Sequence, residues 1–206
     1  MIMFATPCYG GMVTQEYLES QLALKGTLML IDLKHEHLFI KNESLIPRGR
    51  NTCAATFLKS ECTHLMFIDA DIQFTPDDVA KLWNLQKGVG CGVYPMKQEG
   101  APYAAWVGGK LLVDKDMAKE PFKVDYAGTG FMIIHREVFV RLQKAHPEWK
   151  YEESYGEAWA FFQDPIEEGI HLSEDYFFCK RYREIGGEVW MDPRVRLKHV
   201  GSKVYG

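Results

Sequence analysis

Residues 64–94, HLMFIDADIQFTPDDVAKLWNLQKGVGCGVY, predict a strand, a helix and a second strand in succession. The apolar runs 64–69 and 89–94 are typical of buried strands, and the pattern over 75–88 is typical of a helix. Thr75 suits the N-cap of that helix, because its hydroxyl can accept a hydrogen bond from a free backbone N–H. Strand–helix–strand order favours a parallel pairing, so this stretch predicts an α/β fold.

The same alternation continues on both sides of this stretch. Further strands are predicted at 2–6, 27–33, 108–114, 122–128, 130–135, 188–192 and 195–199, and further helices at 14–26, 50–61, 136–146 and 173–187. Residues 147–170 are rich in aromatic and acidic side chains and lack periodicity, which predicts a long ordered loop. We therefore predict one α/β domain with a mostly parallel central sheet, helices on both faces and an irregular second half.

Composition excludes several classes of function. The net charge of -4 over 206 residues argues against binding to nucleic acid or to an anionic membrane, which both favour a basic protein. No apolar run approaches the ~20 residues of a membrane helix, so no membrane insertion is expected. The odd number of scattered cysteines predicts a reduced, soluble, cytoplasmic protein. These cysteines are Cys8, Cys53, Cys62, Cys91 and Cys179.

Asp69 and Asp71 end the strand 64–69, at the edge where open α/β sheets bind ligands. An EF-hand loop starting at Asp69 requires glycine and glutamate where the chain has Phe74 and Ala80. An aspartyl-phosphate phosphatase would have threonine in place of Gln73. Two alternatives remain: solvated turn residues, or a site where the pair shares a divalent cation and a nucleotide ribose.

Six segments resemble, in order, the glycosyltransferases of the GT-A fold. They are FATPCYGG (4–11), IPRGRN (46–51), LMFIDADIQF (65–74), YAGTGFMIIHREVF (126–139), LSEDYFFCKRYREIGGEVWMDP (172–193) and VRLKHVGS (195–202). The likeness covers nearly the whole chain and is strongest to the compact GT-A domain that chlorella viruses encode, which would place the protein in the host cytoplasm. It implies a single Rossmann-like GT-A domain over 1–206, with a donor half at about 1–100 and an acceptor half at about 101–206. The chain can also be one domain of a larger polypeptide.

The resemblance assigns a metal site to this chain. It implies that Asp69 holds the nucleotide ribose, that Asp71 binds the metal, and that His199 adds a metal ligand, with Asp69 close enough to contribute. Imidazole and carboxylate ligands together suit Mn²⁺, with Mg²⁺ as the alternative. A histidine at a strand end is otherwise a common polar surface residue.

Nucleotide contacts are expected from three further segments. After the first strand lie Thr6, Pro7, Cys8 and Tyr9, where the segment is alternatively only a glycine turn. At a predicted helix start lie Arg48, Arg50 and Asn51, and the helix dipole disfavours cations there unless an anion is near. Solvated surface arginines are the alternative. Ala70, Trp106, Gly128 and Gly130 complete the predicted donor-binding residues, although core packing is the more common role of a single tryptophan and a strand kink is the alternative for the two glycines.

Ser173, Glu174 and Asp175 open a predicted helix and resemble the acidic motif whose aspartate deprotonates the acceptor hydroxyl. The resemblance makes Asp175 the catalytic base and Glu174 a residue that orients the acceptor. Both acids also suit a helix N-terminus, which would lower the pKa of Asp175, whereas a dry sugar site would raise it. The aromatic segment 148–163 is a candidate acceptor platform.

The sequence therefore predicts a metal-dependent, UDP-sugar-using hexosyltransferase that acts on a glycan or glycoprotein hydroxyl, with inversion at the anomeric carbon. Two alternatives stay open. A sugar-nucleotide pyrophosphorylase normally has an arginine-containing loop after its first strand, and TPCYGGM (6–12) has no arginine. A non-catalytic carbohydrate-binding module could use the same aromatic residues.

Overall fold

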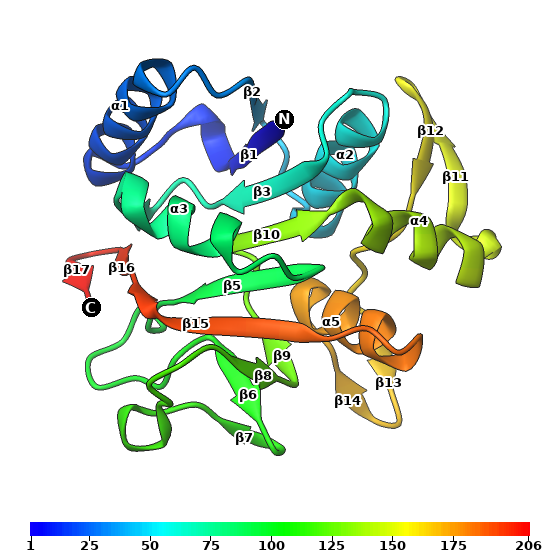
Figure 1. Ribbon diagram of the computed structural model, residues 1–206. Helices are drawn as coiled ribbons and strands as arrows, with labels where there is room; N and C mark the ends of the chain where they lie inside the picture. The colour runs from blue at the N-terminus through cyan, green and yellow to red at the C-terminus, as the bar shows by residue number, and fades with distance from the viewer.

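A seven-stranded sheet with helices on both faces forms the centre of the computed structural model, which describes residues 1–206 (Figure 1). The strand order is β2-β1-β3-β10-β5-β15-β8. The strands are β1 (Ile2–Cys8), β2 (His35–Lys41), β3 (His64–Ile68), β5 (Val89–Val93), β8 (Phe122–Val124), β10 (Phe131–His135) and β15 (Val189–Arg196). Only β10 and β8 run against their neighbours, so the expected α/β fold with a mostly parallel sheet is confirmed.

Two hydrophobic cores lie on opposite faces of this sheet, because successive side chains of a strand point to opposite sides. Ile2 and Phe4 of β1 pack with helices α1 and α3, whereas Met3 and Ala5 pack on the other face. That second core contains buried residues of α2, α4 and α5. The helices are α1 (Gln15–Leu30), α2 (Ile46–Leu58), α3 (Pro76–Asn84), α4 (Arg136–Ala145) and α5 (Glu174–Glu184). None of them combines the length and the apolar character that crossing a membrane requires.

The segment after the first helix differs from the prediction. Helix α1 does not stop at Gly26 but continues to Leu30, so the strand expected at 27–33 is wrong. Leu24 and Leu28 are both buried and lie one turn apart, which carries the buried face of the helix past the glycine. The strand that pairs with β1 is the later segment β2, in parallel register.

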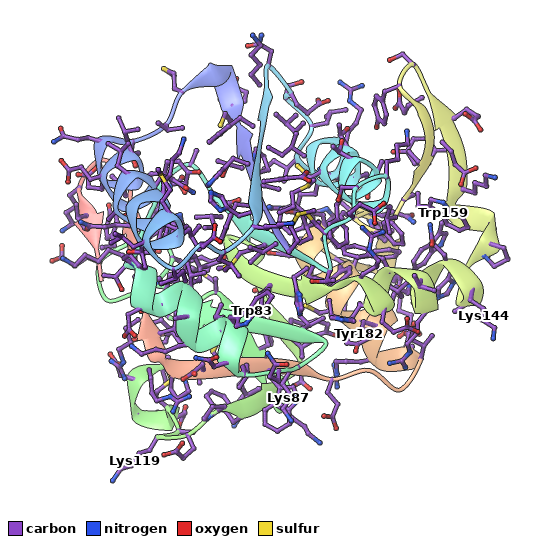
Figure 2. The ribbon with its side chains drawn as sticks, turned by 45° about the horizontal axis from the view of Figure 1, so that its top comes forward. Trp83, Lys87, Lys119, Lys144, Trp159 and Tyr182 are labelled. Atoms are coloured by element: carbon purple, nitrogen blue, oxygen red, sulfur yellow. The ribbon has the colours of Figure 1, made fainter.

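The second half contains more regular structure than expected. Within the predicted loop 147–170, β11 (Lys150–Glu153) and β12 (Gly156–Trp159) form an antiparallel hairpin, and Figure 2 shows Trp159 on it. A second hairpin pairs β13 (Ile166–Glu167) with β14 (Ile170–His171). The strands expected at 108–114 and 122–128 are shorter and contribute to two sheets. β8 joins the large sheet, while β6 (Ala105–Val107), β7 (Lys110–Leu111) and β9 (Tyr126–Ala127) form a small one.

A three-stranded sheet brings the end of the chain to the acidic pair. β4 (Ile72–Gln73) follows Asp71 directly and pairs with β16 (Lys198–Val200), which in turn pairs with β17 (Val204–Tyr205). The Val200 N–H donates a hydrogen bond of 2.8 Å to the Asp71 carbonyl oxygen. This pairing fixes His199 beside Asp71, although the two residues are far apart in sequence.

Candidate functional site

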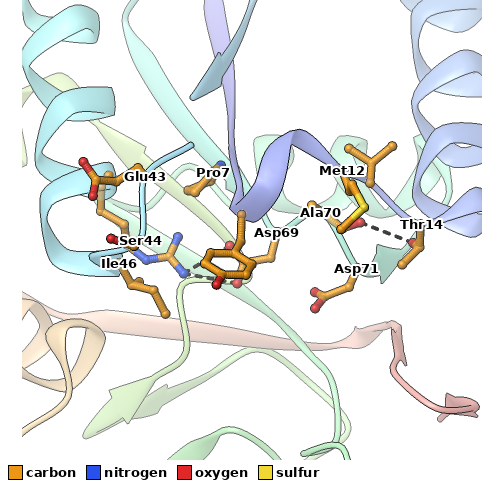
Figure 3. A pocket seen from close by; sticks show the side chains of 13 residues that line it. Pro7, Met12, Thr14, Glu43, Ser44, Ile46, Asp69, Ala70 and Asp71 are labelled. Atoms are coloured by element: carbon orange, nitrogen blue, oxygen red, sulfur yellow. Dashed lines mark hydrogen bonds and ion pairs between the residues drawn. The ribbon is translucent and has the colours of Figure 1, made fainter. Parts of the chain in front are cut away.

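A cavity of about 650 Å³ lies at the carboxyl ends of β1 and β3 (Figure 3). Figure 3 shows Glu43, Ser44 and Ile46 on one side of it and Met12, Thr14 and Asp71 on the other, with Asp69 between them. The predicted residues that line it are Pro7, Tyr9, Arg50, Asp69, Ala70 and Asp71. Glu43, Ser44 and Ile46 were not predicted as site residues, although Ile46 begins the predicted segment IPRGRN (46–51) and the other two precede it closely.

Arg50 connects the two acidic motifs. Its Nη2 lies 3.1 Å from the Asp69 carboxylate and its Nε lies 3.1 Å from Glu174 Oε1. Burial alone would lower the pKa of Arg50, but the charges of Asp69 and Glu174 outweigh this effect and raise it. Arg50 is only 4% exposed and contributes to the cavity wall, and its third nitrogen, Nη1, is buried without a hydrogen-bond partner. An unpaired buried donor is costly, so this nitrogen indicates a place for a ligand oxygen.

Asp71 contacts His199 and Lys97 through different oxygens. The His199 Nε2 lies 3.5 Å from Asp71 Oδ1, while the Lys97 ammonium contacts Oδ2. The His199 Nδ1 lies 2.9 Å from the Pro95 carbonyl oxygen, which can only accept, so Nδ1 carries a proton and Nε2 is the nitrogen that faces Asp71. Burial alone would raise the pKa of Asp71, but His199 and Lys97 outweigh it and hold the pKa below its usual value.

The pair of Asp71 and His199 fits one divalent cation. Asp71 Oδ1 is buried without a hydrogen-bond partner and lies 3.5 Å from His199 Nε2, which can bind a cation when the ring is neutral. Adjacent ligands of an octahedral ion with bonds of 2.0–2.1 Å are about 3 Å apart, close to the observed separation. No cluster of three or more histidine, cysteine or acidic residues could hold a metal by itself. The chain thus offers two ligands, and substrate oxygens and water would have to complete the site. Asp69 faces Arg50 instead.

Asp175 lies in the first turn of α5, close to the same group of residues. Its Oδ1 accepts hydrogen bonds from the Tyr176 N–H, at 2.8 Å, and from the Ser173 hydroxyl. Burial, followed by the negative charge of Glu174, nevertheless raises the pKa of Asp175 to about 6. The sequence left this balance open, and in the folded chain burial outweighs the helix N-terminus. A carboxylate with this pKa is ionised at neutral pH and can accept a proton.

Tyr94, which was not predicted, occupies the space between Gly128 and Gly130. Its hydroxyl accepts a hydrogen bond of 2.9 Å from the Gly130 N–H. A Cβ added at Gly128 would lie 2.2 Å from the hydroxyl oxygen, and one at Gly130 would lie 2.7 Å from it. Both glycines therefore leave room for Tyr94 at the sheet edge. Burial, then the charges of Asp69 and Asp175, raises the pKa of this hydroxyl well above its usual value.

Two residues predicted from the first strand do not line the cavity. Thr6 is buried, and its hydroxyl lies 2.5 Å from the Tyr17 hydroxyl in the core. Cys8 is buried as well, and burial followed by the charge of Asp69 raises the pKa of its thiol. Both residues therefore lie behind the cavity wall that Pro7 and Tyr9 form.

Three other predicted residues do not line the cavity and are held by other partners. Arg48 is paired with Glu43, with Nε 2.6 Å from Oε2, and its side chain is 51% exposed. The Asn51 amide exchanges two hydrogen bonds of 2.9 Å with the backbone of Phe162. Trp106 donates its Nε1–H to the hydroxyl of Tyr176 at 3.1 Å, next to Asp175 rather than next to Asp69.

The fold is similar to that of two solved structures. The crystal structure of A197 from STIV superposes with a TM-score of 0.60 and 18% identity over 97% of this chain and 85% of that chain. The crystal structure of GalNAc-T7 with UDP, GalNAc and Mn²⁺ gives a TM-score of 0.55 and 14% identity over 97% of this chain but only 44% of that chain. No family model and no curated protein matches the sequence. At these identities the likeness establishes the fold, which is GT-A-like mixed α/β.

Proposed function

We propose that the protein is a metal-dependent glycosyltransferase that moves a hexose from a UDP-sugar to a hydroxyl group of a glycan or glycoprotein. The observation that carries the proposal is the bridge formed by Arg50. It joins Asp69, beside the 650 Å³ cavity, to Glu174, the neighbour of Asp175. This contact supports a single site in which the proposed nucleotide-binding residues lie beside the proposed base.

Binding of the donor nucleotide is assigned to the cavity. The base and ribose would lie between the Pro7–Tyr9 turn and the Glu43–Ile46 segment, with the Asp69 carboxylate accepting hydrogen bonds from ribose hydroxyls. The unpaired Nη1 of Arg50 is available to a sugar or phosphate oxygen. We assign this contact to Arg50 and not to Arg48, because Glu43 already neutralises the exposed Arg48 guanidinium.

The diphosphate end of the donor is assigned to Asp71 and His199, which would hold Mn²⁺ or Mg²⁺. A divalent cation held there supplies positive charge for the departing diphosphate. The hydrogen bond from His199 Nδ1 to the Pro95 carbonyl fixes the ring and keeps Nε2 directed at Asp71. The solved GalNAc-T7 structure, which contains UDP and Mn²⁺, is consistent with this assignment.

Asp175 is assigned the proton transfer. Its carboxylate takes the proton of the acceptor hydroxyl while the acceptor oxygen forms a bond to the anomeric carbon and the bond from that carbon to the diphosphate breaks. The base and the leaving group act on opposite faces of the sugar, so the product is inverted, through an oxocarbenium-like transition state. Ser173 and the Tyr176 N–H hold the carboxylate in place.

Calorimetric titration with UDP, with and without Mn²⁺, tests the donor site. The wild-type protein should bind UDP more tightly with Mn²⁺, and Asp71→Ala should remove that dependence. The exposed Asp77, at the start of α3, provides the matched control, since Asp77→Ala should behave as wild type. Mn²⁺-dependent binding that persists in Asp71→Ala would contradict the metal site. Nucleotide-independent sugar binding would favour a carbohydrate-binding module.

A further inference from the structure

Lys97 lies on the segment between β5 and β6. It is not a ligand of the proposed metal and does not line the nucleotide cavity. Its ammonium contacts Oδ2 of Asp71, and its side chain remains 40% exposed. The stem of the side chain passes over Gly201, where an added Cβ would lie 3.2 Å from Lys97 Cδ. Because Gly201 has no side chain, it leaves room for the Lys97 side chain to reach Asp71.

The balance of charge around the site shows why such a cation matters. Asp69, Asp71, Glu174 and Asp175 are four carboxylates, and the one buried cation among them is Arg50. Even with a divalent cation present, this group keeps an excess of negative charge, and the diphosphate of a donor brings more. Like charges at short range repel by several kcal/mol in a partly buried site. Apart from Arg50, Lys97 is the only lysine or arginine paired with any of these carboxylates.

Lys97 and His199 contact different oxygens of Asp71. Lys97 is on Oδ2, whereas His199 faces Oδ1, the oxygen without a hydrogen-bond partner. A cation held on Oδ1 therefore leaves Lys97 in place. An ammonium group has three N–H donors, and Asp71 uses one of them, so two remain for another anion.

We propose that Lys97 binds a phosphate oxygen of the donor diphosphate, as a second positive group that the chain itself supplies beside the metal. The inference rests on the proposed function and names a further binding residue for it. Its partial exposure allows the ammonium to turn toward a phosphate without leaving Asp71. Lysine binds phosphate as a point charge, which requires proximity but no fixed planar geometry.

The test compares the affinities of UDP and uridine for wild type, Lys97→Met and Lys97→Arg, by calorimetry in Mn²⁺ and again in EDTA. Lys97→Met should weaken UDP binding about 10- to 100-fold, the usual effect of a lost charged hydrogen bond, in both conditions. Uridine, which has no phosphate, should bind all three proteins equally. Lys97→Arg should recover most of the UDP affinity.

Lys203, between β16 and β17, provides the matched control, because it is a half-exposed lysine paired with Glu99, outside the acidic group. Lys203→Met should bind UDP as wild type does. If Lys97→Met also binds UDP as wild type does, or gains Mn²⁺ affinity with no loss of UDP affinity, Lys97 only balances Asp71 and the inference is wrong. If wild type itself fails to bind UDP, the proposed function is wrong instead.

Discussion

Asp175 shows how burial can outweigh a helix N-terminus in setting a pKa. The residue has two hydrogen-bond donors on one oxygen, Ser173 and the Tyr176 N–H, and both favour the charged form. Burial of the Asp175 carboxylate and the negative charge of Glu174 favour the protonated form and outweigh these hydrogen bonds, so the pKa rises to about 6. The result is a carboxylate that is still ionised at neutral pH but holds a proton more firmly than a surface aspartate.

Replacement of this residue is expected to separate binding from transfer. Asp175→Asn keeps the shape and the acceptor oxygen of the side chain but cannot take a proton. We expect turnover to fall about 10²- to 10⁴-fold, the usual contribution of a general base, with UDP affinity nearly unchanged. Single-turnover kinetics and calorimetry measure the two quantities. A loss of less than tenfold in turnover would show that another group is the base.

The pH dependence of the same pair of proteins provides the control. Wild-type turnover should decline as the pH falls through about 6, because protonated Asp175 cannot act as a base. The folded-state pKa lies above the usual value, so ionisation of this carboxyl lowers stability above about pH 6. That loss fades as the pH falls from about 6 and is gone once the pH is well below the usual aspartate pKa, where the carboxyl is protonated in the folded and the unfolded chain alike. Asp175→Asn should therefore raise the melting temperature more at pH 7.5 than at pH 4.

Helix α3 is the element that the sequence predicted best, because its signals are local. Thr75 caps the helix as expected, and the Asp78 carboxylate reaches back to the Thr75 N–H at 2.9 Å, which completes a capping box. The end of α1 and the hairpin β11–β12 were missed for the opposite reason. Burial of Leu28 and the cross-strand partners of Tyr151 depend on distant parts of the chain.

Some residues of the candidate site were likewise predictable from local sequence pattern, and others were not. The positions of Asp69 and Asp71 at a strand end followed from local pattern, and so did the helix start at Ser173. The different directions of Arg48 and Arg50 did not, because they depend on where helix α2 begins and on which side faces the sheet. Tyr94 and Lys97 act through tertiary contacts alone, with Gly128 and Asp71 respectively, and no motif marks either residue.

The cap of α3 gives a prediction at the scale of the element. Thr75→Ala removes the hydroxyl that accepts from the Asp78 N–H and leaves a buried carboxylate with one partner fewer. We expect the free energy of unfolding to fall by about 1 kcal/mol in urea titrations. Thr27→Ala in the interior of α1 is the control, since Thr27 is exposed and alanine is the better helix former there. Equal losses in the two variants would contradict the role of the cap.

At the scale of the whole molecule, the two halves predicted from sequence are interleaved in one sheet. β10, from the second half, lies between β3 and β5 of the first half, and β15 pairs with the other side of β5. Each of the two cores also contains residues of both halves. We therefore propose that residues 1–206 are a single domain, in which neither half has a complete sheet of its own.

Urea unfolding of the intact chain tests this proposal. Far-UV circular dichroism reports the helices and strands, while tryptophan fluorescence reports both faces, since Trp83 packs on one core and Trp149 and Trp159 pack on the other. The two transitions should coincide, as expected for one cooperative unit. Two resolved transitions would instead indicate that the halves unfold independently.

The place of β10 at the middle of the sheet also determines when the chain can fold during its synthesis. β3 ends at Ile68, but its partner β10 begins only at Phe131, after roughly 60 more residues. At typical translation rates of about 5–20 residues per second, β3 and β5 wait several seconds on the ribosome with apolar edges unpaired. A nascent chain paused before β10 emerges is therefore the form of this protein most in need of a chaperone.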